Sequence, residues 1–376
     1  MKIEKLTLPD SAIDFLKSQG YEKLYPPQAD CVKSGLLDGK SILVSAPTAS
    51  GKTLIAMLAM LSYLSKNKGK VIYLSPLRAL AAEKFTEFKK LEKISLGKKI
   101  KTSISTGDFE NIEKNLEKSN ILILTNEKMD SIIRHGAEWI DDIGLVISDE
   151  VHLIGDESRG PTLEMILTHL KLLESKPQII GLSATITNSN EIADWLDCKL
   201  VKNDWRPVPL SEGVCDGGKV TMSDGETFEV KPSLRGIPID LGVQSVQNGG
   251  QSLVFAETRV RSKSLATKAA DVISQLLVKK ELTALEKTSK QILSENEHTE
   301  IVKTLATLVK KGVAFHHAGL NQKCREIVEK EFRKGTIKLL SSTPTLAAGV
   351  NLPARRVVIS NINRYNAKVG ANRPIS

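Results

Sequence analysis

Aromatic residues and cysteines are scarce in this chain, and it has no long apolar runs. Only 4% of its residues are aromatic, which disfavours a binding surface built from rows of stacked bases. The 4 cysteines lie far apart and form no CxxC pair, so neither a zinc site nor a disulfide framework is expected. The longest apolar stretches stop well short of the roughly 20 residues that a membrane span needs, and the N-terminus lacks a signal-peptide pattern. We therefore expect a cytoplasmic protein without a membrane partner.

What is present fits a basic globular protein of two domains. The composition is 41% hydrophobic and 26% charged, which is close to the ordinary values for folded domains. A length of 376 residues suggests two domains, at roughly 100 to 200 residues each. Lysine and arginine exceed aspartate and glutamate by nine (53 against 44), so the surface favours polyanions. Charge alone does not identify the polyanion as a nucleic acid.

Short β-branched apolar runs alternate with helical patterns, which predicts parallel sheets covered by helices. A first series of expected strands occupies residues 41–45, 71–74, 121–124, 145–148 and 179–182. The pattern restarts with expected strands at residues 252–255, 313–316, 338–341 and 357–360, and with helices over 260–311. Prolines within residues 205–210 and a glycine-rich stretch over 213–225 separate the two series, since both interrupt regular structure. We therefore predict an α/β fold with one domain at residues 1–204 and a second at residues 205–376.

The segment Ala46–Thr53 follows an expected strand and opens an apolar helix. A turn with this sequence in this context is typical of a phosphate-binding P-loop. Gly51 is needed where a side chain would block the approach of phosphate oxygens to backbone N–H groups. Lys52 would reach the β and γ phosphates, and the Thr53 hydroxyl would ligate Mg²⁺. The cofactor-binding residues expected in this turn are Ala49, Ser50, Gly51, Lys52 and Thr53.

Two adjacent carboxylates, Asp149 and Glu150, follow the expected strand at residues 145–148. Ligands of open α/β sheets bind at the carboxyl ends of the strands, so both acids are expected to face the same phosphates as Lys52. Asp149 would hold Mg²⁺, and Glu150 would orient and deprotonate an attacking water. A solvated strand end also carries such pairs, but the P-loop favours a nucleotide site. The predicted catalytic residues are Lys52, Asp149 and Glu150.

With both motifs in hand, the chain resembles a superfamily 2 helicase over nearly its whole length, with Asp149–His152 as a DExH box. The resemblance implies two tandem RecA-like P-loop motor domains that use ATP and Mg²⁺. Further features are similar to the Ski-type branch, and within it to the archaeal Hel-type DNA repair helicases, relatives of HelQ and of the polymerase-theta helicase domain. These features are the linker at residues 205–210, the segment 342–353, the segments 25–28 and 363–366, and the alanine at position 46.

The resemblance also implies roles for residues outside the two nucleotide-binding motifs. The Gln28 amide would pair with adenine, while Gly349 and Asn351 would approach the nucleotide from the second domain. A further set would couple the nucleotide to the nucleic-acid groove, namely His152, Ser183 and Thr185. The residues expected to contact nucleic acid are Pro76, Arg78, Thr106, Gly107, Thr125, Arg259, His317 and Thr343.

One motif of the family is missing from this sequence. Superfamily 2 members carry an arginine-containing motif VI, Q-x-x-G-R-x-G-R, shortly after the position of Ser376, and no such string occurs here. Arginine fingers contribute about 10³ to 10⁵ in rate in other NTPases. The second motor domain is therefore expected to be incomplete, and ATP hydrolysis by this fragment is expected to be weak. Residues 357–375 resemble the family's strand-separating β-hairpin, with an ordinary sheet-edge hairpin as the alternative.

The function implied by the resemblance is a monomeric, ATP-dependent motor that unwinds DNA from 3′ to 5′ in repair or replication-fork processing. Its partner would be single-stranded or forked DNA. A first alternative is a Ski-type RNA helicase, because only contacts to the 2′-hydroxyl distinguish RNA from DNA. A second alternative is a nonenzymatic clamp or partner-binding module that uses ATP as a structural ligand.

Overall fold

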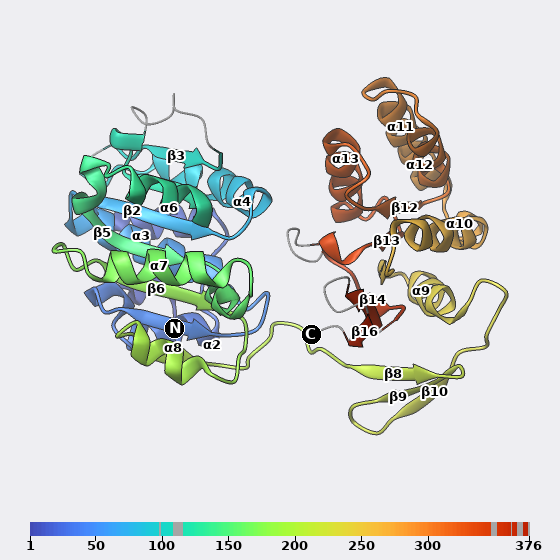
Figure 1. Ribbon diagram of the computed structural model, residues 1–376, viewed down its shortest axis with the longest axis horizontal. Coiled ribbons are helices and arrows are strands. Elements are labelled where there is room, and N and C mark those ends of the chain that lie inside the picture. The colour runs from blue at the N-terminus through green and yellow to red at the C-terminus, as the bar shows by residue number, and fades with distance from the viewer. Residues whose placement is uncertain (98, 108–115, 347–351, 362, 367–370, 375–376) are drawn as a thin grey trace. The chain divides into compact units, whose positions relative to one another are not determined.

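The computed structural model describes residues 1–376 except 98, 108–115, 347–351, 362, 367–370 and 375–376 (Figure 1). The chain divides into two compact units, Met1–Leu210 and Ser211–Ser376. Each unit contains its own parallel sheet. None of the helices in the described part of the chain combines the length and the apolar character that a bilayer crossing demands.

In its described residues, the first unit holds a seven-stranded sheet with the order β3-β4-β2-β5-β6-β1-β7, in which neighbouring strands run parallel. The strands are β1 (Ile42–Ser45), β2 (Lys70–Ser75), β3 (Thr102–Ser105), β4 (Ile121–Thr125), β5 (Ile143–Ser148), β6 (Gln178–Ser183) and β7 (Lys199–Lys202). The predicted strands of this unit are all present, and the α/β prediction is confirmed. The edge strands β3 and β7 were not predicted, because each is short and largely polar.

Helices cover both faces of this sheet, as the alternation within β1 requires. Ile42 and Val44 pack into the core that contains α3, whereas Leu43 packs into the core that contains α7, so α3 and α7 lie on opposite faces (Figure 1). The helices of this unit are α1 (Asp10–Ser18), α2 (Pro26–Lys33), α3 (Lys52–Lys66), α4 (Arg78–Phe88), α6 (Asn126–Arg134), α7 (Gly160–Lys171) and α8 (Ser189–Trp195). Short 3₁₀ helices are η1 (Ile3–Lys5), η2 (Leu36–Asp38), η3 (Lys89–Lys93), η5 (Glu138–Asp142) and η6 (Val151–Gly155).

Within the residues described for the second unit, a four-stranded parallel sheet has the order β12-β13-β11-β14. Its strands are β11 (Ser252–Phe255), β12 (Val313–His316), β13 (Leu339–Ser342) and β14 (Arg356–Ile359). Its helices are α9 (Ile237–Gln247), α10 (Arg259–Gln275), α11 (Lys279–Ser294), α12 (Glu300–Lys310) and α13 (Gln322–Arg333), with the 3₁₀ helix η7 at Pro344–Leu346. The predicted strands and the helical stretch are again present. The two units thus have the tandem α/β architecture that the sequence predicted.

The glycine-rich stretch between the two parallel sheets is more regular than expected. It forms an antiparallel sheet of β8 (Gly213–Asp216), β9 (Lys219–Met222) and β10 (Thr227–Glu229). The sequence predicts the domain boundary in this region and no strands there. Gly217, Gly218 and Gly225 all adopt positive φ, which tight hairpin turns require, so the Asp-Gly pairs were the signal that could have revealed these strands.

The predicted hairpin over residues 357–375 is only partly correct. Residues Arg356–Ile359 form β14, which pairs in parallel with β11 and belongs to the sheet of the second unit. The antiparallel pair is confined to β15 (Asn363–Asn366) and β16 (Ala371–Pro374). Residues 367–370 between them lie outside the described residues. The apolar run at 357–359 is therefore a sheet strand, consistent with its β-branched composition.

Candidate functional site

The turn between β1 and α3 has the backbone shape of an anion-binding loop. Ala49 has φ +65° and Gly51 has φ +87°, both in the left-handed region. A left-handed alanine is unusual, and such strained residues cluster at functional sites. The Ala46 N–H donates to the Ser183 carbonyl at 3.2 Å, which ties the start of the turn to β6. The loop thus leaves the carboxyl edge of the sheet and opens α3 at Lys52.

Two polar groups of this turn fit a bound phosphate. The Lys52 ammonium donates to the carbonyls of Ala46 at 2.9 Å and Pro47 at 3.4 Å. The Ser50 hydroxyl is fully buried and has no hydrogen-bond partner among the described residues. A buried polar group without a partner is costly, and hydrogen bonds between charged groups are stronger than those to carbonyls. A phosphate would therefore satisfy Ser50 and give Lys52 a better acceptor.

The predicted acids Asp149 and Glu150 directly follow β5. Both carboxylates interact electrostatically with the Lys52 ammonium. Burial lowers the pKa of Lys52, and the carboxylates of Glu150 and Asp149 oppose that shift. Asp149 is 8% exposed, and its Oδ1 accepts the N–H of Glu150 at 3.0 Å. Glu150 has φ +52°, a second strained residue at this edge. The structure thus brings the three residues predicted as catalytic together.

Burial and the neighbouring Asp149 raise the pKa of Glu150 above its usual value of 4.5, while Lys52 and Lys84 act in the opposite direction. The folded state therefore binds this proton more tightly than the unfolded chain. The stability that this adds is complete below the unfolded pKa and is lost as the pH rises through the folded pKa.

We accordingly expect Glu150→Gln to be more stable than the original chain at about pH 7, and this advantage to vanish near pH 4. Chemical denaturation of both proteins at the two pH values measures the difference, in which the other titrating groups largely cancel. An equal difference at both pH values would contradict the electrostatic assignment.

His152 stands between the acid pair and the segment after β6. Its Nδ1 lies 3.3 Å from Glu150 Oε2 and 3.5 Å from Ser183 Oγ, and the Ala184 N–H points to it at 3.4 Å. Burial, followed by Lys52, lowers the pKa of His152, which favours the neutral ring. A protonated Nδ1 donates to Glu150, whereas an unprotonated Nδ1 accepts from Ala184. His152 and Ser183 thus meet at this site, while Thr185 is exposed beyond it.

Gln28 lies behind the P-loop rather than on an open surface. Its side chain is buried, its Oε1 accepts the N–H of Tyr25 at 2.7 Å, and its Nε2 donates to the Gly51 carbonyl at 3.3 Å. The amide therefore ties the start of α2 to the phosphate-binding turn, with one N–H and one lone pair left over. Tyr25 and Trp205 place their rings 4.6 Å apart beside it. Sequence reasoning missed this aromatic pair, because Trp205 was noticed only as part of a linker.

Two further residues of the site were missed. The Tyr73 hydroxyl, fully buried in β2, donates to Asp149 Oδ2 at 2.6 Å. The Lys84 ammonium, from α4, donates to Thr53 Oγ1 at 2.8 Å. Neither belongs to a motif that the sequence displays, and a tyrosine inside an apolar strand gives no separate signal.

The residues of the first unit predicted to contact nucleic acid follow the carboxyl ends of β2, β3 and β4, on the same sheet edge as the P-loop. Pro76 is buried, Arg78 is exposed at the start of α4, and Thr106 and Gly107 are half-buried. Thr125 is 3% exposed, and its hydroxyl accepts the N–H of Lys128 at 3.4 Å as the N-cap of α6. The structure therefore gathers these positions at one edge, with Thr125 already engaged in its own helix.

In the second unit, Arg259, His317 and Thr343 follow the ends of β11, β12 and β13. Arg259 is exposed. His317 is buried, and burial together with Arg259 lowers the pKa of its ring. Thr343 is buried, and its N–H donates to the His316 carbonyl at 3.2 Å. Gly349 and Asn351 lie outside the described residues, so their predicted approach to the nucleotide stays a prediction.

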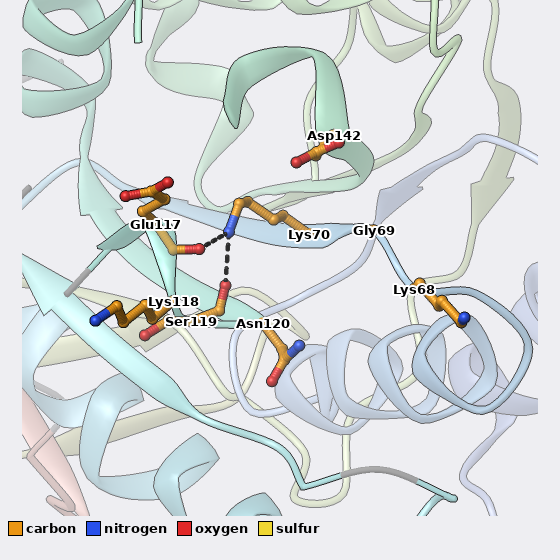
Figure 2. A pocket seen from close by; sticks show the side chains of 8 residues that line it. All are labelled: Lys68, Gly69, Lys70, Glu117, Lys118, Ser119, Asn120 and Asp142. Carbon is orange, nitrogen blue, oxygen red and sulfur yellow. Dashed lines mark hydrogen bonds between the residues drawn. The ribbon is translucent and has the colours of Figure 1, made fainter. Parts of the chain in front are cut away.

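A polar pocket lies on the first unit (Figure 2), at the amino ends of the strands and thus at the edge of the sheet opposite the P-loop. It is formed where β2, β4 and β5 begin, around Lys70. The Lys70 ammonium donates to the main-chain carbonyls of Ser119, at 3.1 Å, and Glu117. Because this ammonium already has two main-chain acceptors, Lys70 ties the start of β2 to the segment before β4.

Comparison with known proteins fits this geometry. Residues 25–192 match the family described as DEAD/DEAH box helicase, and residues 268–367 match the helicase conserved C-terminal domain. The chain is 44% identical over 372 residues to the ATP-dependent DNA helicase Hel308 of Methanocella arvoryzae, covering 99% of this chain and 50% of that protein. It is 44% identical over 366 residues to the protein of the same name from Pyrococcus horikoshii, covering 97% of this chain and 49% of that protein. The chain thus spans about half the length of these relatives. Their similarity and the two matched domains show that the chain belongs to the superfamily 2 helicases of the Hel308 type.

Proposed function

We propose that this chain is the motor part of an ATP-dependent DNA helicase. The observation that carries the proposal is the meeting of Lys52, Asp149 and Glu150 at one sheet edge, beside a strained phosphate-binding turn. A structural ligand would not require a carboxylate with a raised pKa beside it, whereas a general base benefits from one. The relatives are named as ATP-dependent DNA helicases, which supports the same activity here.

In the proposed reaction, the turn that contains Ser50 and Gly51 holds phosphate oxygens with its N–H groups, and Ser50 donates its unpaired hydroxyl. Lys52 exchanges the carbonyls of Ala46 and Pro47 for phosphate oxygens. Thr53 and Asp149 would hold Mg²⁺, which neutralises the charge that develops on the phosphates. Glu150 accepts the proton of the attacking water.

The remaining assignments extend this proposal to the rest of the nucleotide and to the strand. Adenine would lie against the Tyr25–Trp205 pair with Gln28 at its edge, because aromatic rings favour stacking with a base. Residues 1–204 and 205–376 would act as two motor domains, the second contributing Gly349 and Asn351. His152 and Ser183 would link Glu150 to β6. We propose a monomeric motor that moves from 3′ to 5′ on single-stranded or forked DNA in the cytoplasm.

The single-stranded DNA would be held through its phosphates by the residues at the carboxyl edges of the two sheets. We expect Arg78→Ala to weaken binding of a single-stranded DNA several-fold and to reduce the slope of log K against log salt by about 0.7, the share of one phosphate contact. Fluorescence anisotropy with labelled oligothymidylate at several salt concentrations measures both quantities.

The matched control is Arg134→Ala, which removes an exposed arginine that is paired with Asp130 at 2.9 Å at the end of α6. This variant is expected to keep the original slope. If the two variants show the same affinity and the same salt slope, the proposed path of the DNA over α4 is wrong.

DNA is the proposed substrate because the relatives are named DNA helicases. Competition between DNA and RNA strands of the same sequence tests this choice. Stronger competition by RNA would favour the Ski-type RNA helicase instead, since the phosphate contacts proposed here are common to both nucleic acids.

A further inference from the structure

Lys84 in α4 is a buried ammonium to which the proposed chemistry gives no role. Its side chain is 11% exposed, and lysines are almost never buried without partners. Its Nζ donates to Thr53 Oγ1 at 2.8 Å and lies 3.3 Å from Glu87 Oε2 and 3.7 Å from Glu83 Oε1. The Lys84 ammonium therefore connects α4, at the sheet edge proposed to bind DNA, with the Thr53 hydroxyl proposed to ligate Mg²⁺.

The same face of α4 also supports the second proposed magnesium ligand. Ala81, Lys84 and Phe88 are its buried residues, at the three- and four-residue spacing that places side chains on one face of a helix. The Phe88 ring lies 5.1 Å from the ring of Tyr73, edge-on. Tyr73 in turn donates to Asp149 Oδ2 at 2.6 Å. Both proposed ligands are thus held by a group that belongs to α4 or packs against it.

The contact between Lys84 and Thr53 competes with magnesium binding. The oxygen that accepts the ammonium is the one proposed to bind Mg²⁺, and two cations at one oxygen repel each other. The same ammonium also donates to Glu87 Oε2 at 3.3 Å. The lysine therefore keeps an acidic partner on α4 when it releases Thr53, and the nucleotide site decides whether it does.

We propose that Lys84 is a positioning residue that holds the Thr53 hydroxyl when no magnesium-nucleotide is bound, and that it releases this hydroxyl and keeps Glu87 when Thr53 ligates the metal. Through this exchange α4, whose first turn carries Arg78, responds to the occupancy of the nucleotide site. The inference rests on the proposed function, because it requires Mg²⁺ and a nucleotide at the P-loop.

The test measures how strongly Mg²⁺ promotes nucleotide binding to the 376-residue chain. The probe is methylanthraniloyl-AMPPNP, and the quantity is its dissociation constant in excess EDTA divided by that in Mg²⁺. Lys84→Met removes the cation that opposes the metal but keeps the apolar stem, so we expect this ratio to rise about 10-fold, within the usual range of coupling between sites. A purely structural role changes both constants by the same factor, and an unchanged ratio overturns the proposal.

Two variants of the same helix sharpen the result. Glu87→Gln replaces the charged acceptor of Lys84 by a neutral and weaker one, so the ammonium stays on Thr53 and the ratio is expected to fall, which is a change in the opposite direction. Lys84→Arg keeps the charge and is expected to leave the ratio within about threefold of the original. Lys89→Met removes an exposed lysine of the adjoining 3₁₀ helix and is the control that leaves the ratio unchanged. If Lys84→Met fails to fold, the sign of the Glu87→Gln effect decides the matter.

The effect of nucleotide binding on DNA affinity is measured by titration with labelled oligothymidylate, with and without magnesium and the same nucleotide analogue. The original chain is expected to change its DNA affinity by about 5-fold or more when the nucleotide binds, and Lys84→Met is expected to lose most of this change. Equal responses in the two proteins, or none in the original chain, overturn transmission through α4. Failure of the original chain to bind the analogue under either condition refutes the proposed nucleotide site itself.

Discussion

Glu150→Gln is expected to reduce the rate of ATP hydrolysis by about 10² to 10⁴-fold, the usual contribution of a general base. Glutamine keeps the size of the side chain but accepts no proton from water. The main chain at this position, with φ +52° and its N–H on Asp149 Oδ1 at 3.0 Å, does not depend on the carboxylate. Affinity for magnesium-nucleotide should therefore stay within about threefold of the original. Single-turnover hydrolysis in the presence of single-stranded DNA and equilibrium binding of the nucleotide measure the two effects separately.

The matched control for this experiment is Glu164→Gln, an exposed acid on α7. Its rate and affinity should equal those of the original chain. A variant of Glu150 that hydrolyses ATP at the original rate would show that Glu150 is not the base. Binding of ATP without hydrolysis by either protein would support the nonenzymatic clamp, with ATP as a structural ligand. A variant that instead loses nucleotide affinity would show that the carboxylate organises the site and does not act as the base.

The sequence was most informative where one short segment carries both a fold signal and a chemical one. Ala46–Thr53 combines a buried strand end, a turn and an apolar helix, so its place at the carboxyl edge of the sheet follows from α/β topology. The acids after β5 follow by the same rule. The edge strands β3 and β7 escaped prediction because their polar residues leave little of the apolar pattern on which strand prediction depends.

The supporting residues of the site could not be predicted, because they act across large sequence separations. Lys84 meets Thr53 from a different helix, and Tyr73 meets Asp149 from a neighbouring strand. In the sequence, Lys84 is one lysine among many and Tyr73 is one apolar residue of a strand. Gln28 was identified, but its engagement with the Gly51 carbonyl depends on the packing of α2 against the P-loop. Such pairings require the fold, since charge and hydropathy alone do not specify partners.

Gly51→Ala is expected to abolish most nucleotide binding. Comparison with Gly39→Ala separates the effect of backbone strain from the effect of the close contact with Gln28. Both glycines are left-handed, with φ +87° and +83°, so alanine costs about 1–2 kcal/mol of backbone strain at either position. A Cβ at position 39 meets nothing within 4 Å, whereas a Cβ at position 51 would lie 2.0 Å from Gln28 Nε2.

Relief of that contact at position 51 has a cost, because the Gln28 amide is hydrogen-bonded at both ends. Its Oε1 accepts from Tyr25 and its Nε2 donates to Gly51 itself, so either the side chain gives up these hydrogen bonds or the phosphate-binding turn shifts. We expect Gly39→Ala to lower only the free energy of unfolding, and Gly51→Ala to weaken nucleotide binding by about 100-fold as well, equivalent to about 2.7 kcal/mol. Denaturant unfolding and fluorescent nucleotide titration of both variants measure these quantities. Equal nucleotide affinity in the two variants would mean that phosphate binding does not depend on the close approach of Gln28 to this turn.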